Sequence, residues 1–282
     1  MIIGPRVIFN LKSRQIGQTV REEGVKEHLK KTGVPTMGGI IILIPLMITS
    51  LLWTKINAFV VISLLVTAGM GLIGFFDDIT KVVRARSLGL TPRQKLAGQI
   101  FTGLAAALAI NYYPGLRFEL ASAVSNSIEM SPTATQVPIF GALDLGWLYI
   151  PFAVAVIVGA SNAVNLTDGL DGLAAGSMIV ATTPFLVFAY VCGHLIFARH
   201  LGVAYIPGVG ELAIICAALI GGSFGFLWHN AHPAAVFMGD TGSLALGGAL
   251  GAIALCSKTE IFLAIVGGIF VIEALSVILQ VS

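Results

Sequence analysis

Long apolar runs separated by short polar segments dominate this chain. Each run is close to the ~20 residues that an α-helix needs to cross ~30 Å of hydrocarbon. The pattern therefore predicts an all-α protein, a polytopic transmembrane helix bundle with about eight spans. The expected spans are residues 38–55, 58–76, 96–113, 147–163, 173–193, 210–228, 243–257 and 261–281.

No internal repeat, low-complexity tract or second domain interrupts the pattern, so we expect residues 1–282 to form one integral membrane domain. Residues 1–37 are mostly polar and basic and are expected to lead into a bundle formed by residues 38–282. Residues 1–9 are too short and too broken to be a signal peptide or a complete span. We expect them to end a helix that began earlier, in a longer protein.

Composition supports the membrane assignment. The chain is 56% hydrophobic and 11% charged, whereas soluble domains average about 25% charged residues. Continuous runs, rather than alternating strands of about ten residues, exclude a transmembrane β-barrel. The three cysteines lie in apolar runs without metal or redox spacing and are expected to be buried.

Charge placement predicts the orientation of the bundle. Eight spans put residues 1–37, 77–95, 162–173 and 229–243 and the C-terminus on one side. That side holds 12 of the 16 Lys and Arg residues, seven in 1–37 and five in 77–95. The positive-inside rule makes it the cytoplasmic side. The same side collects five carboxylates, namely Asp77, Asp78, Asp168, Asp171 and Asp240.

Asp77 and Asp78 are expected to end the second span. Two solvated carboxylates at a membrane exit would explain an isolated pair equally well. Adjacent carboxylates repel each other, however, which suits one of them to proton abstraction. Lys81, one helical turn further on, could neutralise one acid or meet a phosphate.

Asp168 and Asp171 lie in the segment NAVNLTDGLDG, between two apolar runs. They are three residues apart, so on a helical turn both carboxylates would face the same way. Carboxylates at a membrane boundary are unfavourable unless they hold a cation, a proton or a ligand. Asn165, Thr167 and Asp168 are also good N-cap residues for the next helix, but capping explains only one or two of these polar side chains.

Asp240 lies in the segment FMGDTGS, which could by itself be only a helix cap. Asn230 and His232 are possible hydrogen-bonding partners on the same side. The HxxH spacing of His229 and His232 lacks the glutamate of HExxH and is a poor zinc signature. Phe237 is more often a packing residue, but it could stack on a flat base.

Together these residues describe a site for a metal and phosphates. Carboxylates suit a hard cation, and Mg²⁺ usually binds through one or two of them plus substrate phosphates. Lys30, Lys81 and Lys95 would balance phosphate charge, although Lys30 could equally contact lipid headgroups. Glu273 is expected to be buried in the last span and is a weaker candidate.

Five segments resemble the phospho-N-acetylmuramoyl-pentapeptide transferase family, within the polyprenyl-phosphate N-acetylhexosamine-1-phosphate transferases. They are GVPTMGG (33–39), GFFDDITKVVRARSLGLTPRQK (74–95), NAVNLTDGLDGLAAG (162–176), FGFLWHNAHPAAVFMGDTGSLALGG (224–248) and EALSVILQV (273–281). The resemblance covers essentially the whole chain, in order. Each motif is modest alone, and together they are specific.

The resemblance implies transfer of phospho-MurNAc-pentapeptide from UDP-MurNAc-pentapeptide to undecaprenyl phosphate, giving lipid I and UMP in peptidoglycan synthesis. It implies Mg²⁺ dependence, an inner-membrane enzyme whose site faces the cytoplasm, and a homodimer. No nucleic-acid partner is expected. Carried over residue by residue, it makes Asp240 the metal ligand and Asp77 and Asp78 the catalytic pair. The substrate-binding residues that it implies are Lys30, Lys81, Lys95, Asn165, Asp168, Asp171, Asn230 and Phe237.

The sequence departs from the family pattern at both of its ends. Family members have a complete helix before Ile2, and after the EALSVILQV helix they have a loop with consecutive histidines and a last span.

Two rival functions are considered. One is a related transferase acting on UDP-GlcNAc. The other is an ion-coupled secondary transporter, although transporters bind near the bilayer midplane between repeats.

Overall fold

The computed structural model describes residues 3–13, 34–84, 89–113, 116, 118–120, 128–137 and 141–281. These residues are mainly helical, which confirms the all-α class. The helices are α1 (Gly4–Ser13), α3 (Ile40–Trp53), α4 (Ala58–Val83), α5 (Pro92–Tyr112), α6 (Tyr149–Thr167), α7 (Leu173–Cys192), α8 (Leu195–Leu201), α9 (Leu212–Asn230), α10 (Gly239–Cys256), α11 (Glu260–Val266) and α12 (Gly268–Val281). Two 3₁₀ turns, Gly146–Leu148 and Val209–Glu211, lead into α6 and α9.

A helix stands at each of the eight predicted apolar runs. In the part of the chain that the structure describes, five helices are long and apolar enough to cross a membrane, or six if a bent pair counts as one span. Of the others, α3 has only 14 residues, and α5 opens with the charged turn PRQK. The multi-pass prediction is confirmed, with fewer full-length spans than expected.

The ends of two helices differ from the prediction. α4 does not end at residue 76 but continues to Val83, so Asp77 and Asp78 lie inside its last two turns. The extension contains an ion pair between Asp77 and Lys81 at the i, i+4 spacing that supports a helix. α10 begins at Gly239, four residues earlier than expected, which places Asp240 in its first turn.

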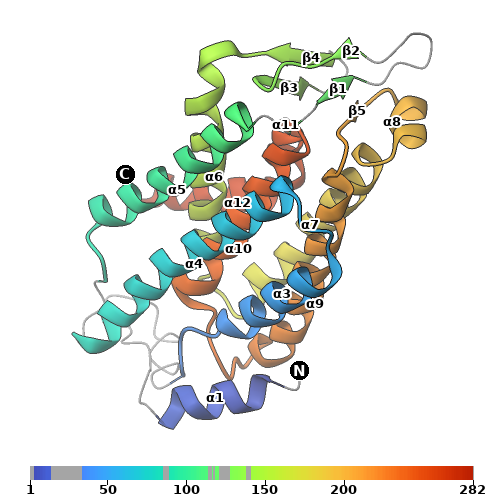
Figure 1. Ribbon diagram of the computed structural model, residues 1–282. Helices are drawn as coiled ribbons and strands as arrows, with labels where there is room; N and C mark the ends of the chain where they lie inside the picture. The colour runs from blue at the N-terminus through green and yellow to red at the C-terminus, as the bar shows by residue number, and fades with distance from the viewer. Residues whose placement is uncertain are drawn as a thin grey trace.

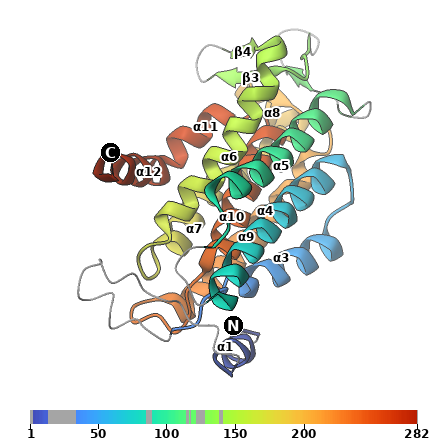
Figure 2. The same cartoon turned by 90° about the vertical axis from the view of Figure 1, so that its left-hand side faces the viewer.

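The last predicted span, residues 261–281, is formed by two helices instead of one unbroken helix. α11 and α12 meet at a bend of 71°, where two consecutive glycines, Gly267 and Gly268, interrupt the helix. Figure 2 shows α12 projecting away from the bundle. Glu273 lies on this projecting helix and is partly exposed, so the prediction that it is buried is wrong.

α10 is the central helix of the bundle. Every residue from Thr241 to Cys256 is buried. The helix is composed largely of Gly and Ala, which let neighbouring helices approach closely in an apolar environment. α4 and α6 pack directly against it, α5 packs on both α4 and α6, and α9 packs on α3 and α7. The three cysteines are buried and free, as expected.

Short strands close the end of the bundle opposite α1 (Figure 1). β1 (Glu119–Leu120) pairs antiparallel with β2 (Ile128–Glu129) and with β5 (Ala204–Tyr205). β3 (Ala134–Val137) and β4 (Gly141–Asp144) form a hairpin in which Ala134 lies opposite Asp144. The sequence pattern predicted only polar loops here, because strands this short carry no readable alternation.

Candidate active site

The carboxylates of Asp77, Asp78 and Asp240 converge where the end of α4 meets the start of α10. One oxygen of each lies within 4.8 Å of the others. Gly74 makes this approach possible, since a Cβ atom there would lie 2.1 Å from the backbone oxygen of Asp240. Asp77 and Asp78 are buried, and Asp240 is nearly so. The predicted convergence of these three acids is therefore confirmed.

Asp78 caps the N-terminus of α10 from the neighbouring helix. Its carboxylate accepts from the backbone N–H groups of Asp240 at 3.2 Å and Thr241 at 2.9 Å, and from Thr241 Oγ1 at 2.7 Å. A helix N-terminus leaves such N–H groups unpaired and favours negative charge. Gly239, with φ of 74°, leaves room, because a Cβ atom there would lie 2.7 Å from Asp78 Oδ2.

Asp77 points toward the connection between α4 and α5. Its Oδ1 accepts from the backbone N–H of Leu90 at 2.9 Å, and its Oδ2 lies 2.6 Å from Lys81 Nζ. The two adjacent acids therefore have different environments. Asp78 is engaged by a helix N-terminus, whereas Asp77 shares the partly exposed ammonium group of Lys81 with Asp240.

Two lysines and an amide surround Asp240. Lys81 Nζ lies 3.0 Å and Lys95 Nζ 2.8 Å from Asp240 Oδ2. Asn165 Nδ2 donates to the other oxygen, Asp240 Oδ1, at 2.8 Å and to Ser243 Oγ at the same distance. Three helices, α4, α5 and α6, thus contribute side chains to one carboxylate on a fourth helix, α10.

Asp168 joins the same cluster, but Asp171 does not. Asp168 is the C-cap residue of α6 and accepts a hydrogen bond from the backbone of Gly239. Burial, and secondly the charge of Asp240, raises the pKa of Asp168 well above its usual value. Asp171 instead lies 3.0 Å from His232 Nδ1 and accepts from Ala234 N at 3.3 Å. The expectation that both carboxylates face one way is wrong, because α6 ends at Thr167 and the chain turns between them.

The helix-cap alternative for NAVNLTDGLDG also fails. The N-cap residue of α7 is Gly172, in the left-handed region, and no side chain caps that helix. Instead Asn230 Oδ1 accepts from Gly172 N at 2.9 Å, and Asn230 Nδ2 donates to Val236 O at 2.9 Å. Asn230 therefore ties this turn to the segment that precedes α10.

Phe237 stands beside the TMGG segment, partly exposed. Its backbone N–H donates to Pro35 O and its carbonyl accepts from Gly38 N, both at 2.8 Å. This pairing places the first predicted motif next to the start of α10. Lys30 lies outside the described residues.

The composition of the cluster suits a metal ion. Three carboxylates that lie close together, those of Asp77, Asp78 and Asp240, face only two ammonium groups, those of Lys81 and Lys95. Carboxylate oxygens are the ligands of hard cations. Among the described residues, Asp77, Asp78 and Asp240 are the group of metal-ligating side chains close enough to share an ion.

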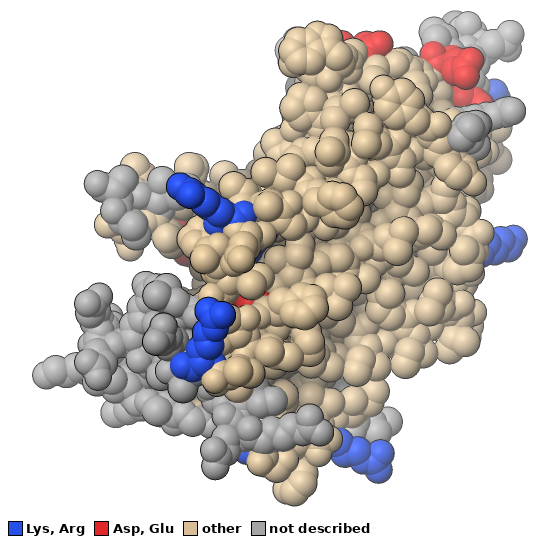
Figure 3. All heavy atoms as spheres, turned by 60° about the vertical axis from the view of Figure 1, so that its left-hand side comes forward, with Lys and Arg blue, Asp and Glu red and all other residues tan. Residues whose placement is uncertain are grey.

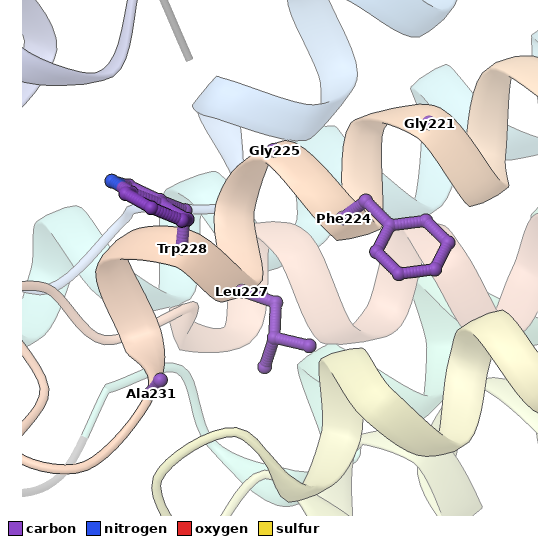
Figure 4. Close-up of a pocket in the computed structure, with 6 residues that line it drawn as sticks. All are labelled: Gly221, Phe224, Gly225, Leu227, Trp228 and Ala231. Carbon is purple, nitrogen blue, oxygen red and sulfur yellow. The ribbon is translucent and has the colours of Figure 1, made fainter.

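Figure 3 shows a hollow with basic side chains at its edges and an acidic side chain visible inside. A different hollow, of about 660 Å³, lies along the outward side of α9 (Figure 4). It is lined by Gly221, Phe224, Gly225, Leu227, Trp228 and Ala231. None of these lining residues is ionisable, so we assign no chemistry to this apolar hollow.

Sequence reasoning missed Thr241 and Ser243, which hold Asp78 and Asn165. Both follow Asp240 within GDTGS, and their place in the first turn of a helix was the available signal. It could not show that the hydroxyl groups would face α4 and α6.

The fold and the cluster together define a polytopic membrane protein with a carboxylate-rich centre. Residues 60–258 match the family described as Glycosyl transferase family 4. Similar curated proteins are named phospho-N-acetylmuramoyl-pentapeptide-transferase. The chain is 50% identical to that of Desulfotalea psychrophila, covering all of this chain and 75% of the relative. It is 48% identical to that of Koribacter versatilis, covering all of this chain and 76% of the relative. The chain belongs to the phospho-N-acetylmuramoyl-pentapeptide transferases of glycosyl transferase family 4.

Proposed function

We propose that this enzyme transfers phospho-MurNAc-pentapeptide from UDP-MurNAc-pentapeptide to undecaprenyl phosphate, releasing UMP and forming lipid I. The observation that carries the proposal is the 50% identity, over the whole chain, with a curated phospho-N-acetylmuramoyl-pentapeptide-transferase. The carboxylate and lysine cluster beside α10 agrees with it, since phosphoryl transfer depends on positioning and on stabilising charge.

Mg²⁺ is the metal that we propose for the cluster, with Asp240 as its main ligand. The donor set is all oxygen, as Mg²⁺ requires, and its uncompensated negative charge favours a cation. When bound, Mg²⁺ would stabilise negative charge on the phosphates and on the leaving UMP.

The side chains of the cluster would bind the phosphates and accept a proton during the reaction. Lys81 and Lys95 would turn from Asp240 toward the phosphate oxygens of the donor. An oxygen of the lipid phosphate attacks the β-phosphorus, and the bond from that phosphorus to the UMP oxygen breaks. Asp77 would hold or accept the proton of the lipid phosphate, because the Asp78 carboxylate is already engaged by three donors of α10.

The donor-binding wall would consist of the turn after α6 and the segment before α10. Asn165, Asp168 and Asp171 would face the nucleotide and sugar phosphate, and Phe237 would lie near the uracil. Asn230 supports this wall by joining its two halves. Lys30 would add a further phosphate contact.

The membrane setting follows from charge placement and from the family. We propose the bacterial inner membrane, with the cluster facing the cytoplasm, because 12 of the 16 basic residues fall on that side of the predicted topology. A homodimer is also proposed, by resemblance to the family.

The test is release of UMP from UDP-MurNAc-pentapeptide by purified protein with undecaprenyl phosphate, with and without Mg²⁺. UDP-GlcNAc in place of the donor tests the related transferase. We expect UMP only with the muramoyl donor, the lipid and Mg²⁺ together. Release from UDP-GlcNAc instead would replace the proposed substrate, and ion uptake into vesicles without UMP release would favour a transporter.

A further inference from the structure

An amide pair lies one helical turn below the cluster, between α5 and α6. Gln99 Nε2 donates to Asn162 Oδ1 at 3.2 Å, and Asn162 Nδ2 donates to Gln99 Oε1 at 2.8 Å. Asn162 Nδ2 also donates to Val158 O at 2.8 Å. Gln99 is only 1% exposed. Asn162 is partly buried, so the pair is shielded from solvent on the Gln99 side and joined in both directions.

The pair is in register with two residues of the cluster. Gln99 follows Lys95 by four residues on α5, and Asn162 precedes Asn165 by three residues on α6, so each lies on the same helix face as its neighbour. Lys95 and Asn165 bind different oxygens of Asp240 and contact each other at 3.4 Å. A shift of α5 along α6 would therefore separate Lys95 from both partners.

Beyond the amide pair and the Lys95–Asn165 contact, the described contacts along this seam are between small or apolar groups. Further along α5, Gly103 faces the backbone of Val154, and Ala106 and Ala107 are buried. Small apolar residues let two helices approach but allow them to slide or rotate. Two reciprocal amide hydrogen bonds fix both the axial position and the rotation, because they form only when the groups are opposite each other.

We propose that Gln99 and Asn162 are positioning residues for the active site, and the proposal rests on the proposed function. They do not touch Asp240. They fix α5 against α6 so that Lys95 and Asn165 reach the two oxygens of the Asp240 carboxylate. A residue that orients a metal ligand in this way typically affects metal affinity or activity by 10–100-fold when it is changed.

A swap of the two amides tests the proposal. Gln99→Asn leaves the pair one methylene too short, and Asn162→Gln makes it one methylene too long. The double variant restores the total length, and all three variants keep a polar amide at each site. Thr102→Val is the matched control, because it removes a hydrogen bond to Gly98 O on the same helix without touching the amide pair.

Three quantities are measured for each protein: kcat for UMP release, the Kd for Mn²⁺ from electron paramagnetic resonance without substrate, and the melting temperature in detergent. Each single variant is expected to lose roughly tenfold in kcat and in Mn²⁺ affinity, with the double variant within about threefold of the natural protein and Thr102→Val unchanged.

Single variants with natural kcat and Mn²⁺ affinity would overturn the proposal. So would a double variant that is no better than the two single losses combined, or losses that merely follow the melting temperature in all variants. Absence of UMP release by the natural protein would overturn the proposed function alone, since Mn²⁺ binding would still report on the pair.

Discussion

α10 carries a buried charged cluster at each end, and the two clusters differ in balance. At its start, the three carboxylates of Asp77, Asp78 and Asp240 face two lysines. Just beyond its end, one lysine, Lys258, lies near one acid, Glu260. Both clusters are enclosed by helices, so burial alone does not mark a functional site.

The cluster around Lys258 is closed and satisfied. Lys258 is fully buried, and its Nζ donates to Pro132 O and to Tyr149 Oη, 4.1 Å above the ring centre of Tyr149. Glu260 accepts from Thr135 Oγ1 and Tyr149 Oη. These bonds fasten the β3–β4 hairpin to the bundle.

The difference in charge balance distinguishes the structural cluster around Lys258 from the proposed functional cluster around Asp240. A buried charge pair with every partner in place stabilises one conformation and leaves nothing for a ligand to supply. The cluster around Asp240 carries excess negative charge that a metal ion and phosphates can organise. Variants at the Lys258 cluster should therefore change stability, and variants at the Asp240 cluster should change turnover.

Asp77→Asn should cause the largest loss of turnover. It removes the proposed proton acceptor while keeping an oxygen for Leu90 N. We expect a loss of UMP release on the order of 10³-fold, with a melting temperature close to that of the natural protein. A loss below tenfold would move the role of base to another residue.

Lys258→Met should have the largest effect on stability. It leaves Glu260 buried without its cation, which typically costs about 3–5 kcal/mol, and turnover per folded molecule should stay near the natural value. Combining it with Glu260→Gln removes the unpaired charge, so the double variant should melt higher than Lys258→Met alone. Equal melting of the two would argue against the pair.

Thr241→Val should produce a smaller effect on both measures. It removes one of three donors to Asp78, and a hydrogen bond to a charged group contributes about 1.5–3 kcal/mol. Because Asp78 holds the start of α10, we also expect turnover to fall by about tenfold or less. Differential scanning fluorimetry and the UMP assay on one preparation measure both, and an unchanged melting temperature would contradict the capping role of Asp78.

The pH dependence of stability gives the smallest effect. Burial lowers the pKa of Lys258 to about 8, against the opposing charge of Glu260, while an unfolded lysine titrates near 10.4. Between these values the unfolded chain binds a proton that the folded one does not, so this residue stabilises the fold increasingly as pH rises. The melting temperature of the natural protein minus that of Lys258→Met should grow by roughly 2–4 °C from pH 8 to 10. A constant difference would contradict the lowered pKa.

The sequence predicted the helices better than their ends. Apolar runs locate helices because span length is set by the membrane, but nothing local shows that α4 continues through Asp77 and Asp78. The bend before α12 has a local signal, Gly267 and Gly268, which lies within a continuous apolar run. The number of spans and the positions of the Lys and Arg residues predicted that Asp77, Asp78 and Asp240 lie on the same side of the membrane. They could not separate Asp168 from Asp171, because the turn after Thr167 depends on contacts with Asn230 and Gly239.

The Lys258 cluster illustrates the same limit. Lys258, Tyr149 and Thr135 are far apart in the sequence, and none belongs to a recognisable motif. Their meeting depends on how the hairpin folds over the end of α10, which is a tertiary contact without a local pattern. Motifs, in contrast, pointed to Asp240, because GDTGS is part of a segment that resembles the family. Its partners in space, Lys81, Lys95 and Asn165, come from three other helices.

One comparison tests the central claim most directly, namely that the cluster at the start of α10 is the transferase active site. Asp240→Asn and Lys258→Met are purified together, and UMP release per folded molecule is measured with the melting temperature of each. The account predicts that Asp240→Asn loses on the order of 10³-fold in turnover with little change in melting, while Lys258→Met does the reverse. Retained turnover in Asp240→Asn, with UMP release intact in the natural protein, would contradict the claim.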